Sequence, residues 1–301
     1  MTSFLLLALA GLGAAVVGLT AHASLGVQIA AVALILVVAP AIAWWHALQP
    51  SNSGEWQPDV ARAPTAEIHG DQLTVSNVRN FRYRSTTDFD ERWEERRLDL
   101  GRLDGLDIFF IHWGSRLIAH TIMSWSFSDG QHLAVSIETR KKKRQRYSTV
   151  AGFFRQYELI YVAADESDVI RLRTNIRREE VYLYRLQVTL AAARRLLLDY
   201  LEAMNEVSRQ PVWYNALVAN CTTTIRSRVI HAGGQVPLSW RLFANGYLPE
   251  LLYARGSFDA SLPFADLRAM SRINQRALAA PADRDFSAWI RGGLPMSRQL
   301  S

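Results

Sequence analysis

The sequence predicts an α+β domain preceded by a hydrophobic membrane segment, and three observations support this prediction. Residues 1–54 contain no Asp, Glu, Lys or Arg, and all 34 basic and 28 acidic residues lie from Glu55 onward. Stretches rich in β-branched and aromatic residues then dominate as far as about residue 188. After that point apolar residues recur at helical spacing, and a block of strands followed by helices is typical of α+β proteins.

Two apolar runs, residues 4–20 and 27–45, account for the membrane segment. Each is near the roughly 20 residues that a helix needs to cross a bilayer, and the link over residues 21–26 is short. We therefore expect a transmembrane helical hairpin over residues 1–48. The alternative is a cleaved signal peptide, because Ala21-His22-Ala23 resembles a small-x-small cleavage site. The absence of any basic residue before the first run favours the hairpin, and the composition excludes a wholly soluble protein and a multi-pass transporter.

A linker rich in Pro and Ser over residues 49–65 leads to a domain over residues 66–301, which is long enough to bury a full core. Six strands are expected from their β-branched and aromatic content: 71–75, 106–113, 117–127, 133–139, 157–162 and 181–188. Two helices are expected to follow them: 189–207 and 221–232. The domain thus begins with strands and ends with helices.

The strands 117–127 and 133–139 form a predicted hairpin whose register follows from its apolar side chains. Three apolar residues of each strand must share one face: Met123, Trp125 and Phe127 with Leu133, Val135 and Ile137. Centring the turn on Asp129 achieves this, and it pairs His120 with Glu138 on the opposite face, with Cβ atoms about 5 Å apart. Such a carboxylate holds one imidazole tautomer and raises the pKa of the ring. The alternative is an ordinary polar pair on a solvent-exposed face of the sheet.

Cys221 is the only cysteine, which excludes an intrachain disulfide. If the second helix begins there, the helix dipole and free N–H groups lower the pKa of the thiol and can hold an oxyanion. Asn220 suits the N-cap position. A distant histidine completes the pattern of a thiol nucleophile, whereas the alternative is a buried structural cysteine. The sequence has no metal-ligand cluster and no glycine-rich phosphate loop, so we expect no metal and no cofactor.

Four stretches of the sequence carry a family resemblance: Ile118-Ala119-His120-Thr121, Ala134-Val135-Ser136-Ile137-Glu138-Thr139-Arg140, Phe154-Arg155-Gln156-Tyr157-Glu158-Leu159-Ile160-Tyr161-Val162, and Trp213-Tyr214-Asn215 with Asn220-Cys221-Thr222-Thr223. Together they are similar to the DUF4105 family, also called the Lnb N-terminal periplasmic domain. The resemblance runs from about Trp56 to the end of the chain. It implies a circularly permuted papain-like (NlpC/P60-like) fold, in which the histidine precedes the cysteine.

The resemblance also implies functional roles for individual residues. Cys221 corresponds to the nucleophile and His120 to the base, while Glu138 as the orienting third member rests on the register argument. Asn220, Thr222 and Tyr214 are expected to support the oxyanion site. Because the relatives that name the family are lipoprotein N-acyltransferases, the resemblance implies a thioester on Cys221, a membrane lipid as possible acyl donor, and a lipoprotein or peptide amine as possible acceptor.

The implied location is the bacterial inner membrane, with the soluble domain facing the periplasm. We expect a membrane-tethered, cysteine-dependent acyltransferase or amidohydrolase of the envelope. Two alternatives stay open at this point, a cell-wall peptide amidase or peptidase and a non-catalytic envelope binding module. The basic run over residues 141–146 is either a solvated loop or a site of attraction to anionic lipid head groups. It has no aromatic platform or groove-reading helix beside it, so no nucleic-acid partner is expected.

Overall fold

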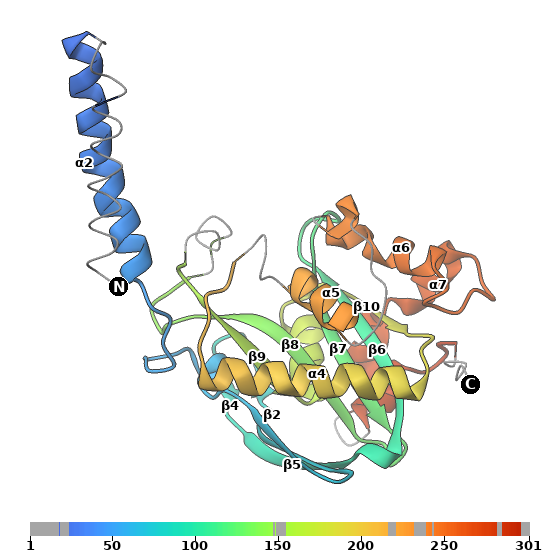
Figure 1. The fold of residues 1–301 in the computed structure, drawn as a ribbon. Coiled ribbons are helices and arrows are strands. Elements are labelled where there is room, and N and C mark those ends of the chain that lie inside the picture. The colour runs from blue at the N-terminus through green and yellow to red at the C-terminus, as the bar shows by residue number, and fades with distance from the viewer. Residues whose placement is uncertain are drawn as a thin grey trace. The chain divides into compact units, whose positions relative to one another are not determined.

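The computed structural model describes residues 18, 24–146, 148, 155–215, 221–231, 239–242, 244–281 and 285–295. The chain divides into two compact units, Met1–Pro50 and Ser51–Ser301, and each is considered by itself (Figure 1). The first unit contains the apolar N-terminal segment, and the second contains the sheet and the remaining helices.

Helix α2 (Leu25–Ala47) confirms the second apolar run as a helix. It has 23 residues and none of its side chains is buried, so by length and composition it can cross a bilayer as an anchor or act as a signal. The first run, residues 4–20, lies outside the described residues apart from Gly18. The structure therefore supports one apolar helix, and the two-helix hairpin stays a prediction.

The second unit is an α+β fold built on a mixed eight-stranded sheet, as the order of the elements predicted. Its strand order is β1-β2-β9-β8-β7-β6-β10, and β5 pairs with β2 beside this path. The bounds are β1 (Thr65–His69), β2 (Gln72–Arg79), β5 (Trp93–Asp99), β6 (Leu103–His112), β7 (Ala119–Phe127), β8 (His132–Arg140), β9 (Glu158–Ala164) and β10 (Glu180–Arg185). All described pairs are antiparallel except β2 with β9, and β3 (Arg82–Tyr83) with β4 (Phe89–Asp90) forms a separate short ribbon.

The β7–β8 hairpin has the register that its apolar pattern predicted. Met123 lies opposite Val135 and Trp125 lies opposite Leu133. The turn closes through Gly130, whose φ of 85° is a conformation that side-chain-bearing residues avoid. This register continues toward His120 and Glu138, so the alternation of the two strands brings both side chains to one face.

Helices cover both faces of the sheet. On one face α4 (Leu190–Arg209) runs across the strands (Figure 1), and Trp125 there packs against Tyr200 and donates its indole N–H to the Ala193 carbonyl at 3.0 Å. The opposite face is buried in a second apolar cluster that includes Ile122 and receives residues from α3 (Glu166–Arg171), α8 (Asn274–Ala279) and α9 (Phe286–Ile290). The alternative of a solvent-exposed face around His120 is therefore excluded, because His120 is 7% exposed and this second cluster keeps water from the face.

Shorter helical segments complete the described fold. They are η1 (Pro58–Val60), η2 (Leu100–Arg102), the π-helical η4 (Leu172–Ile176), α5 (Cys221–His231), η5 (Trp240–Leu242), η6 (Asn245–Tyr247), α6 (Leu248–Ala254) and α7 (Phe264–Ser271). Of these, η4, α5 and η6 bear on the candidate site. Helix α4 begins one residue later and ends two residues later than the predicted helix 189–207, and Thr189 caps its N-terminus by accepting a hydrogen bond from the Ala192 N–H.

Candidate active site

Strands β7 and β8 bring His120, Ser136 and Glu138 into one hydrogen-bonded array. The Nε2 atom of His120 lies 2.7 Å from the Ser136 hydroxyl and 3.1 Å from Oε1 of Glu138. Ser136 donates its hydroxyl proton to the same carboxylate oxygen at 2.7 Å. Because that hydroxyl has only one proton to donate, it accepts from His120, which places a proton on Nε2 and makes Nδ1 the nitrogen that gains or loses the second proton of the ring.

The array is shielded from water and held in place from a second element. His120 is 7% exposed and Ser136 is 1% exposed. Arg173, on η4, donates to Oε1 of Glu138 at 3.0 Å and to Glu179 at 3.1 Å. Burial alone raises the pKa of Glu138, but the charges of His120 and Arg173 and the hydrogen bonds outweigh burial and hold that pKa well below its usual range. Glu138 is therefore an ionised carboxylate that orients the imidazole.

Two members of this array, Ser136 and Arg173, were not among the predicted site residues. Ser136 lies two positions before Glu138 on the same strand, so strand alternation contained a signal that could have found it. Arg173 comes from a π-helical turn that approaches the sheet from a distant part of the sequence, and no local pattern indicates that approach. The sequence thus predicted the pair of His120 and Glu138 but not the two side chains, Ser136 and Arg173, that contact it.

The start of β7 is fixed by a side chain from η6. Asn245 accepts a hydrogen bond from the Ala119 N–H at 2.7 Å and donates one to the Ala119 carbonyl at 2.6 Å. Both groups are nearly inaccessible to water, since Asn245 is 6% exposed and Ala119 is 1% exposed. The carboxamide thereby takes the place of a strand partner one residue before His120, and it restricts where the imidazole can lie.

The neighbouring Gly246 has no room for a side chain. A Cβ atom at this position would lie 1.9 Å from the carbonyl oxygen of Arg116 and 3.1 Å from Cε1 of His112. Gly246 also donates its N–H to the Leu117 carbonyl at 3.1 Å. The close approach of η6 to the segment before β7 therefore requires glycine here.

Replacing Gly246 by alanine is expected to destabilise the protein by about 3 kcal/mol, the upper range for overpacking, because the clash is with backbone atoms that cannot rotate away. The free energy of unfolding of the full chain in detergent, measured by urea titration, checks this. Gly70→Ala is the matched control, since nothing lies within 4 Å of its Cβ position and only its positive φ opposes the substitution. It should cost about 1 kcal/mol, and equal losses in the two variants would contradict the crowding argument.

Cys221 begins helix α5, as the sequence predicted. The helix lies beside β7, β8 and α4, and its Ile225 joins the apolar cluster on the α4 side of the sheet. The side chains of Cys221 and Thr222, and all of Asn220, lie outside the described part of the chain. His120 lies near the beginning of β7 and points to the face of the sheet opposite α4. Contact between His120 and Cys221 would therefore have to occur at the end of the sheet, and it stays a prediction.

Tyr214 lies in the segment that precedes α5. Its N–H donates to the Tyr157 carbonyl at 2.9 Å, and its side chain packs against the cluster that contains Ile225. The adjacent Trp213 forms an isolated bridge with Glu158 at the start of β9. These contacts fix the course of the segment, and they leave the predicted support of an oxyanion by Tyr214 as an expectation.

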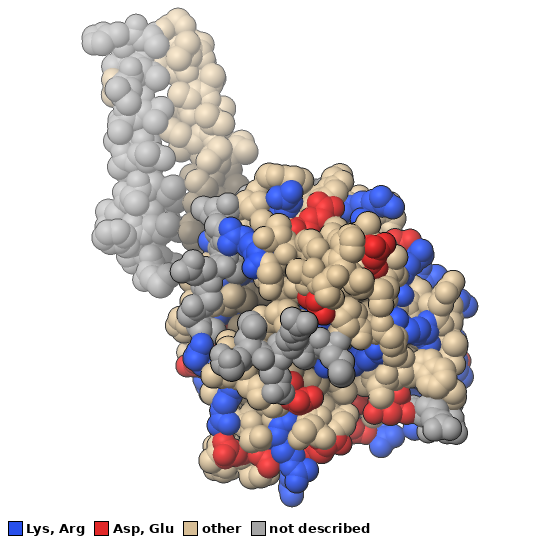
Figure 2. All heavy atoms as spheres, turned by 90° about the vertical axis from the view of Figure 1, so that its right-hand side faces the viewer, with Lys and Arg blue, Asp and Glu red and all other residues tan. Residues whose placement is uncertain are grey.

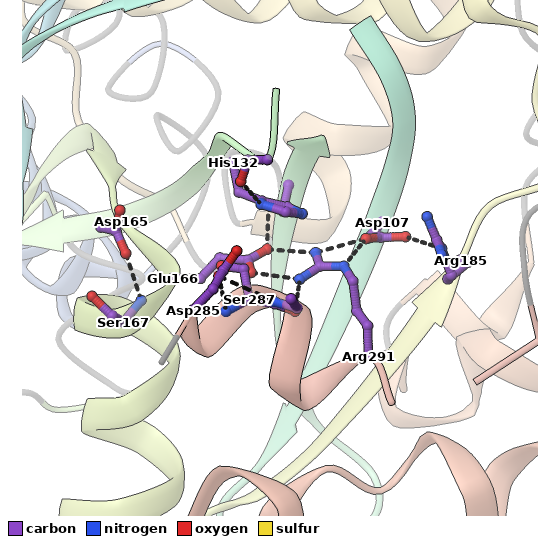
Figure 3. A network of polar contacts seen from close by, with 12 residues as sticks. Asp107, His132, Asp165, Glu166, Ser167, Arg185, Asp285, Ser287 and Arg291 are labelled. Atoms are coloured by element: carbon purple, nitrogen blue, oxygen red, sulfur yellow. Dashed lines mark hydrogen bonds and ion pairs between the residues drawn. The ribbon is translucent and has the colours of Figure 1, made fainter. Parts of the chain in front are cut away.

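A buried ionic network on the same side of the sheet links the C-terminal segment to the core (Figure 3). The guanidinium of Arg291 donates to Asp107 of β6 at 2.7 Å and to both carboxylate oxygens of Glu166 at 2.7 Å. Ser124 donates to Glu166 at 2.6 Å. Burial alone raises the pKa of Glu166, but the Arg291 charge and hydrogen bonds lower it to about 2. Arg185 lies 3.5 Å from the other oxygen of Asp107, so two cations face two carboxylates, which is typical of a structural clamp.

Two hollows open near these groups. A cavity of about 770 Å³ is lined by residues of β3, α3, η4 and α9, and none of the predicted site residues contributes to it. A hollow of about 40 Å³ is lined by Glu138 together with Lys141, Arg173 and Arg177. We place the candidate site at the smaller one, because chemistry is defined by the reacting groups rather than by the volume of a cavity. Among the described residues, no group of three or more His, Cys, Asp or Glu side chains could hold a metal ion.

Comparison with known proteins assigns the sequence to a family. A family model described as the Lnb N-terminal periplasmic domain matches residues 89–246, which is more than half of the chain. The matched segment contains His120, Glu138 and Cys221. No curated protein and no solved structure matches the sequence.

Proposed function

This chain belongs to the Lnb N-terminal periplasmic domain family, and from that premise we propose that it is a membrane-tethered, cysteine-dependent acyltransferase or amidohydrolase of the bacterial envelope. The observation that carries the proposal is the array of His120, Ser136 and Glu138, in which a half-buried, ionised carboxylate fixes the imidazole tautomer. Such an array serves a nucleophile whose proton must be removed and returned. Cys221 is the only thiol in the chain that could fill this role.

The proposed reaction has two half-reactions, and in each of them His120 first accepts a proton and then donates it. Nδ1 takes the proton of the Cys221 thiol, and the thiolate attacks the carbonyl carbon of an acyl ester or amide. As the tetrahedral adduct collapses, the leaving alcohol or amine receives that proton from the imidazolium, and a thioester stays on Cys221. An amine or a water molecule then attacks the thioester, gives its proton to Nδ1, and releases the thiolate, which regains the proton from the ring.

The oxyanion of each tetrahedral adduct needs hydrogen-bond donors. In this proposal the N–H groups at the start of α5 supply them, and Asn220, Thr222 and Tyr214 support that arrangement. The circularly permuted papain-like fold, the hairpin anchor and the use of Glu138 as the orienting residue belong to the same proposal. A half-buried carboxylate that keeps its charge stabilises the imidazolium formed in each half-reaction.

The proposed acyl donor is a membrane lipid, and the proposed acceptor is a lipoprotein or peptide amine. Helix α2 supports this choice, because a helix able to cross a bilayer would keep the domain beside its lipid. The family is one of periplasmic domains, which supports a site on the periplasmic side of the inner membrane. Long-chain acyl groups are poorly soluble in water, so tethering would bring the thiol to the substrate.

Intact-mass spectrometry of the full chain in detergent tests this proposal. After incubation with phospholipid, we expect a fatty-acyl mass on Cys221 that hydroxylamine removes, and no such mass in Cys221→Ala. A peptidyl mass after incubation with cell-wall peptides would instead indicate an amidase or peptidase that uses the same residues. If neither adduct forms and the Cys221→Ser and His120→Ala variants retain full function in cells, a non-catalytic binding module is the remaining reading.

A further inference from the structure

The loop of residues 141–146, here called the basic loop, joins β8 to the rest of the chain and lies beside the site described above, whose hollow Lys141 helps to line. We propose that it is a docking surface for the anionic head groups of the bilayer that holds α2. The proposal goes beyond the chemistry at Cys221 and does not depend on it. It rests on α2 remaining as an uncleaved anchor.

The first observation is the charge of the basic loop. Five of its six residues are basic and none is acidic: Lys141, Lys142, Lys143, Arg144 and Arg146. All except the half-buried Lys141 are exposed, and within the described part of the chain no ion pair involves any of the five. By contrast, Lys and Arg are interspersed with Asp and Glu over much of the face shown in Figure 2. The basic loop is therefore a local concentration of positive charge, in which only Lys142 has described electrostatic partners, the Trp56 ring at 5.9 Å and the carboxylate of Glu158.

The second observation is that the basic loop is fixed to the segment that follows α2. Gln57 donates its N–H to the Lys141 carbonyl at 2.9 Å, and Lys143 donates its N–H to the Glu55 carbonyl at 2.8 Å. The Gln57 side chain donates to the Gln145 carbonyl at 2.7 Å. Two antiparallel stretches thus hold each other through backbone hydrogen bonds, and the cations of the basic loop project from a defined position.

The third observation is the length of chain that separates this position from the membrane helix. Helix α2 ends at Ala47, and Asn52 is already fixed within the second unit, since it donates to the Ser208 carbonyl at 2.6 Å and accepts from Arg140 at 2.8 Å. Five residues span at most about 17 Å when fully extended. The covalent chain therefore keeps the segment that binds the basic loop within a short reach of the end of α2.

Electrostatic attraction favours contact between the basic loop and anionic lipid head groups over such a short distance. Anionic lipids attract juxtamembrane clusters of Lys and Arg, and the attraction falls off over a Debye length of about 10 Å at 0.1 M salt. A cluster held close to the bilayer by its own chain gains this attraction without the entropic cost of first finding the surface. The basic loop would then set the distance between the domain and the lipid.

Limited trypsin digestion of the full chain in lipid nanodiscs tests this inference, because the basic loop is itself a set of trypsin sites. The rate of cleavage within 141–146 is measured by mass spectrometry relative to cleavage at Arg255, an exposed residue after α6. At 50 mM salt we expect at least fivefold slower relative cleavage in discs with one-third phosphatidylglycerol than in phosphatidylcholine discs. At 0.5 M salt the difference should disappear.

Two variants with equal loss of charge make the test specific. K142Q/K143Q retains three cleavage sites in the basic loop and should lose most of the protection in anionic discs. R97Q/R102Q removes two exposed arginines elsewhere in the domain, with side chains 79% and 57% exposed, and should keep the protection. Cys221→Ala should also keep it. Equal relative cleavage in the two kinds of disc, or protection that persists at 0.5 M salt, would overturn the proposal.

Discussion

Replacing Arg291 by methionine is expected to lower the free energy of unfolding by about 3–5 kcal/mol, the range observed when one partner of a buried ion pair is removed. Asp107 is 1% exposed and Glu166 is 0% exposed, so neither carboxylate can recover its lost partner from water. The measurement is urea unfolding of the full chain in detergent, followed by tryptophan fluorescence. Glu166→Gln in the Arg291→Met background should restore part of the loss, because it removes one of the stranded charges.

The control is an arginine whose ion pair is exposed. Arg272 contacts Glu180 at 2.9 Å, with side chains 52% and 45% exposed. Arg272→Met should cost less than about 1 kcal/mol, since solvent screens such pairs. If Arg272→Met and Arg291→Met destabilise the protein equally, burial does not determine the strength of the Arg291 network.

The same network predicts how stability depends on pH. The pKa of Glu166 is about 2 in the folded protein, whereas it is about 4.3 for an unperturbed glutamate such as that in an unfolded chain. As the pH falls, Glu166 is therefore protonated in the unfolded state before it is protonated in the folded state. The stabilisation from Glu166 is complete above its pKa in the unfolded state and is lost as the pH falls toward 2. Between pH 5 and pH 3 the wild-type protein should lose stability that the Arg291→Met/Glu166→Gln variant does not lose.

The second large effect concerns the reactivity of the thiol. His120→Ala is expected to slow alkylation of Cys221 at pH 7 by about tenfold or more, because a thiol without a neighbouring base has a pKa near 8.5 and is only a few per cent ionised. The measurement is the second-order rate constant for iodoacetamide as a function of pH. Since Cys221 is the only cysteine, no other thiol contributes to the signal. The midpoint of the pH profile should move toward 8.5 in the variant.

Ser136→Ala and Glu138→Gln should have smaller effects in the same direction, because they remove the groups that fix the tautomer of His120. The pKa of Glu138 is well below its usual range, so Glu138 keeps its charge above its ordinary pKa and should not produce a limb of the wild-type profile between pH 5 and 9. His132→Ala is the control for loss of an imidazole, since its ring lies near the turn and contacts the Gly130 carbonyl at 3.1 Å. Unchanged alkylation in His120→Ala would contradict the role of His120 as the base.

The sequence predicted the β7–β8 register because two independent local signals agreed. The apolar residues of both strands occur at every second position, and Gly130 permits the turn between them. The pairing of His120 with Glu138 followed from that register without knowledge of the rest of the fold. Helix α4 was predicted for a similar reason, since its apolar residues recur at a spacing that only a helix brings to one face.

The parts that escaped prediction depend on contacts between distant segments. Strand β5 contains the run Trp93-Glu94-Glu95-Arg96-Arg97-Leu98-Asp99, whose charges hide the alternation of a strand. Arg173 and Arg291 have the composition of surface residues, and only the packing of η4 and α9 against the sheet buries them. The burial of His120 could not be predicted either, because the helices that cover its face come from far along the chain.

Asn245 connects two parts of the chain that lie far apart in the sequence. It follows the helix that begins at Cys221, yet its carboxamide secures the strand residue immediately before His120. The position of the proposed base thus depends on a stretch of backbone downstream of the proposed nucleophile. Loss of the Asn245 carboxamide would therefore disturb the position of His120 while leaving the side chains of the candidate site chemically unchanged.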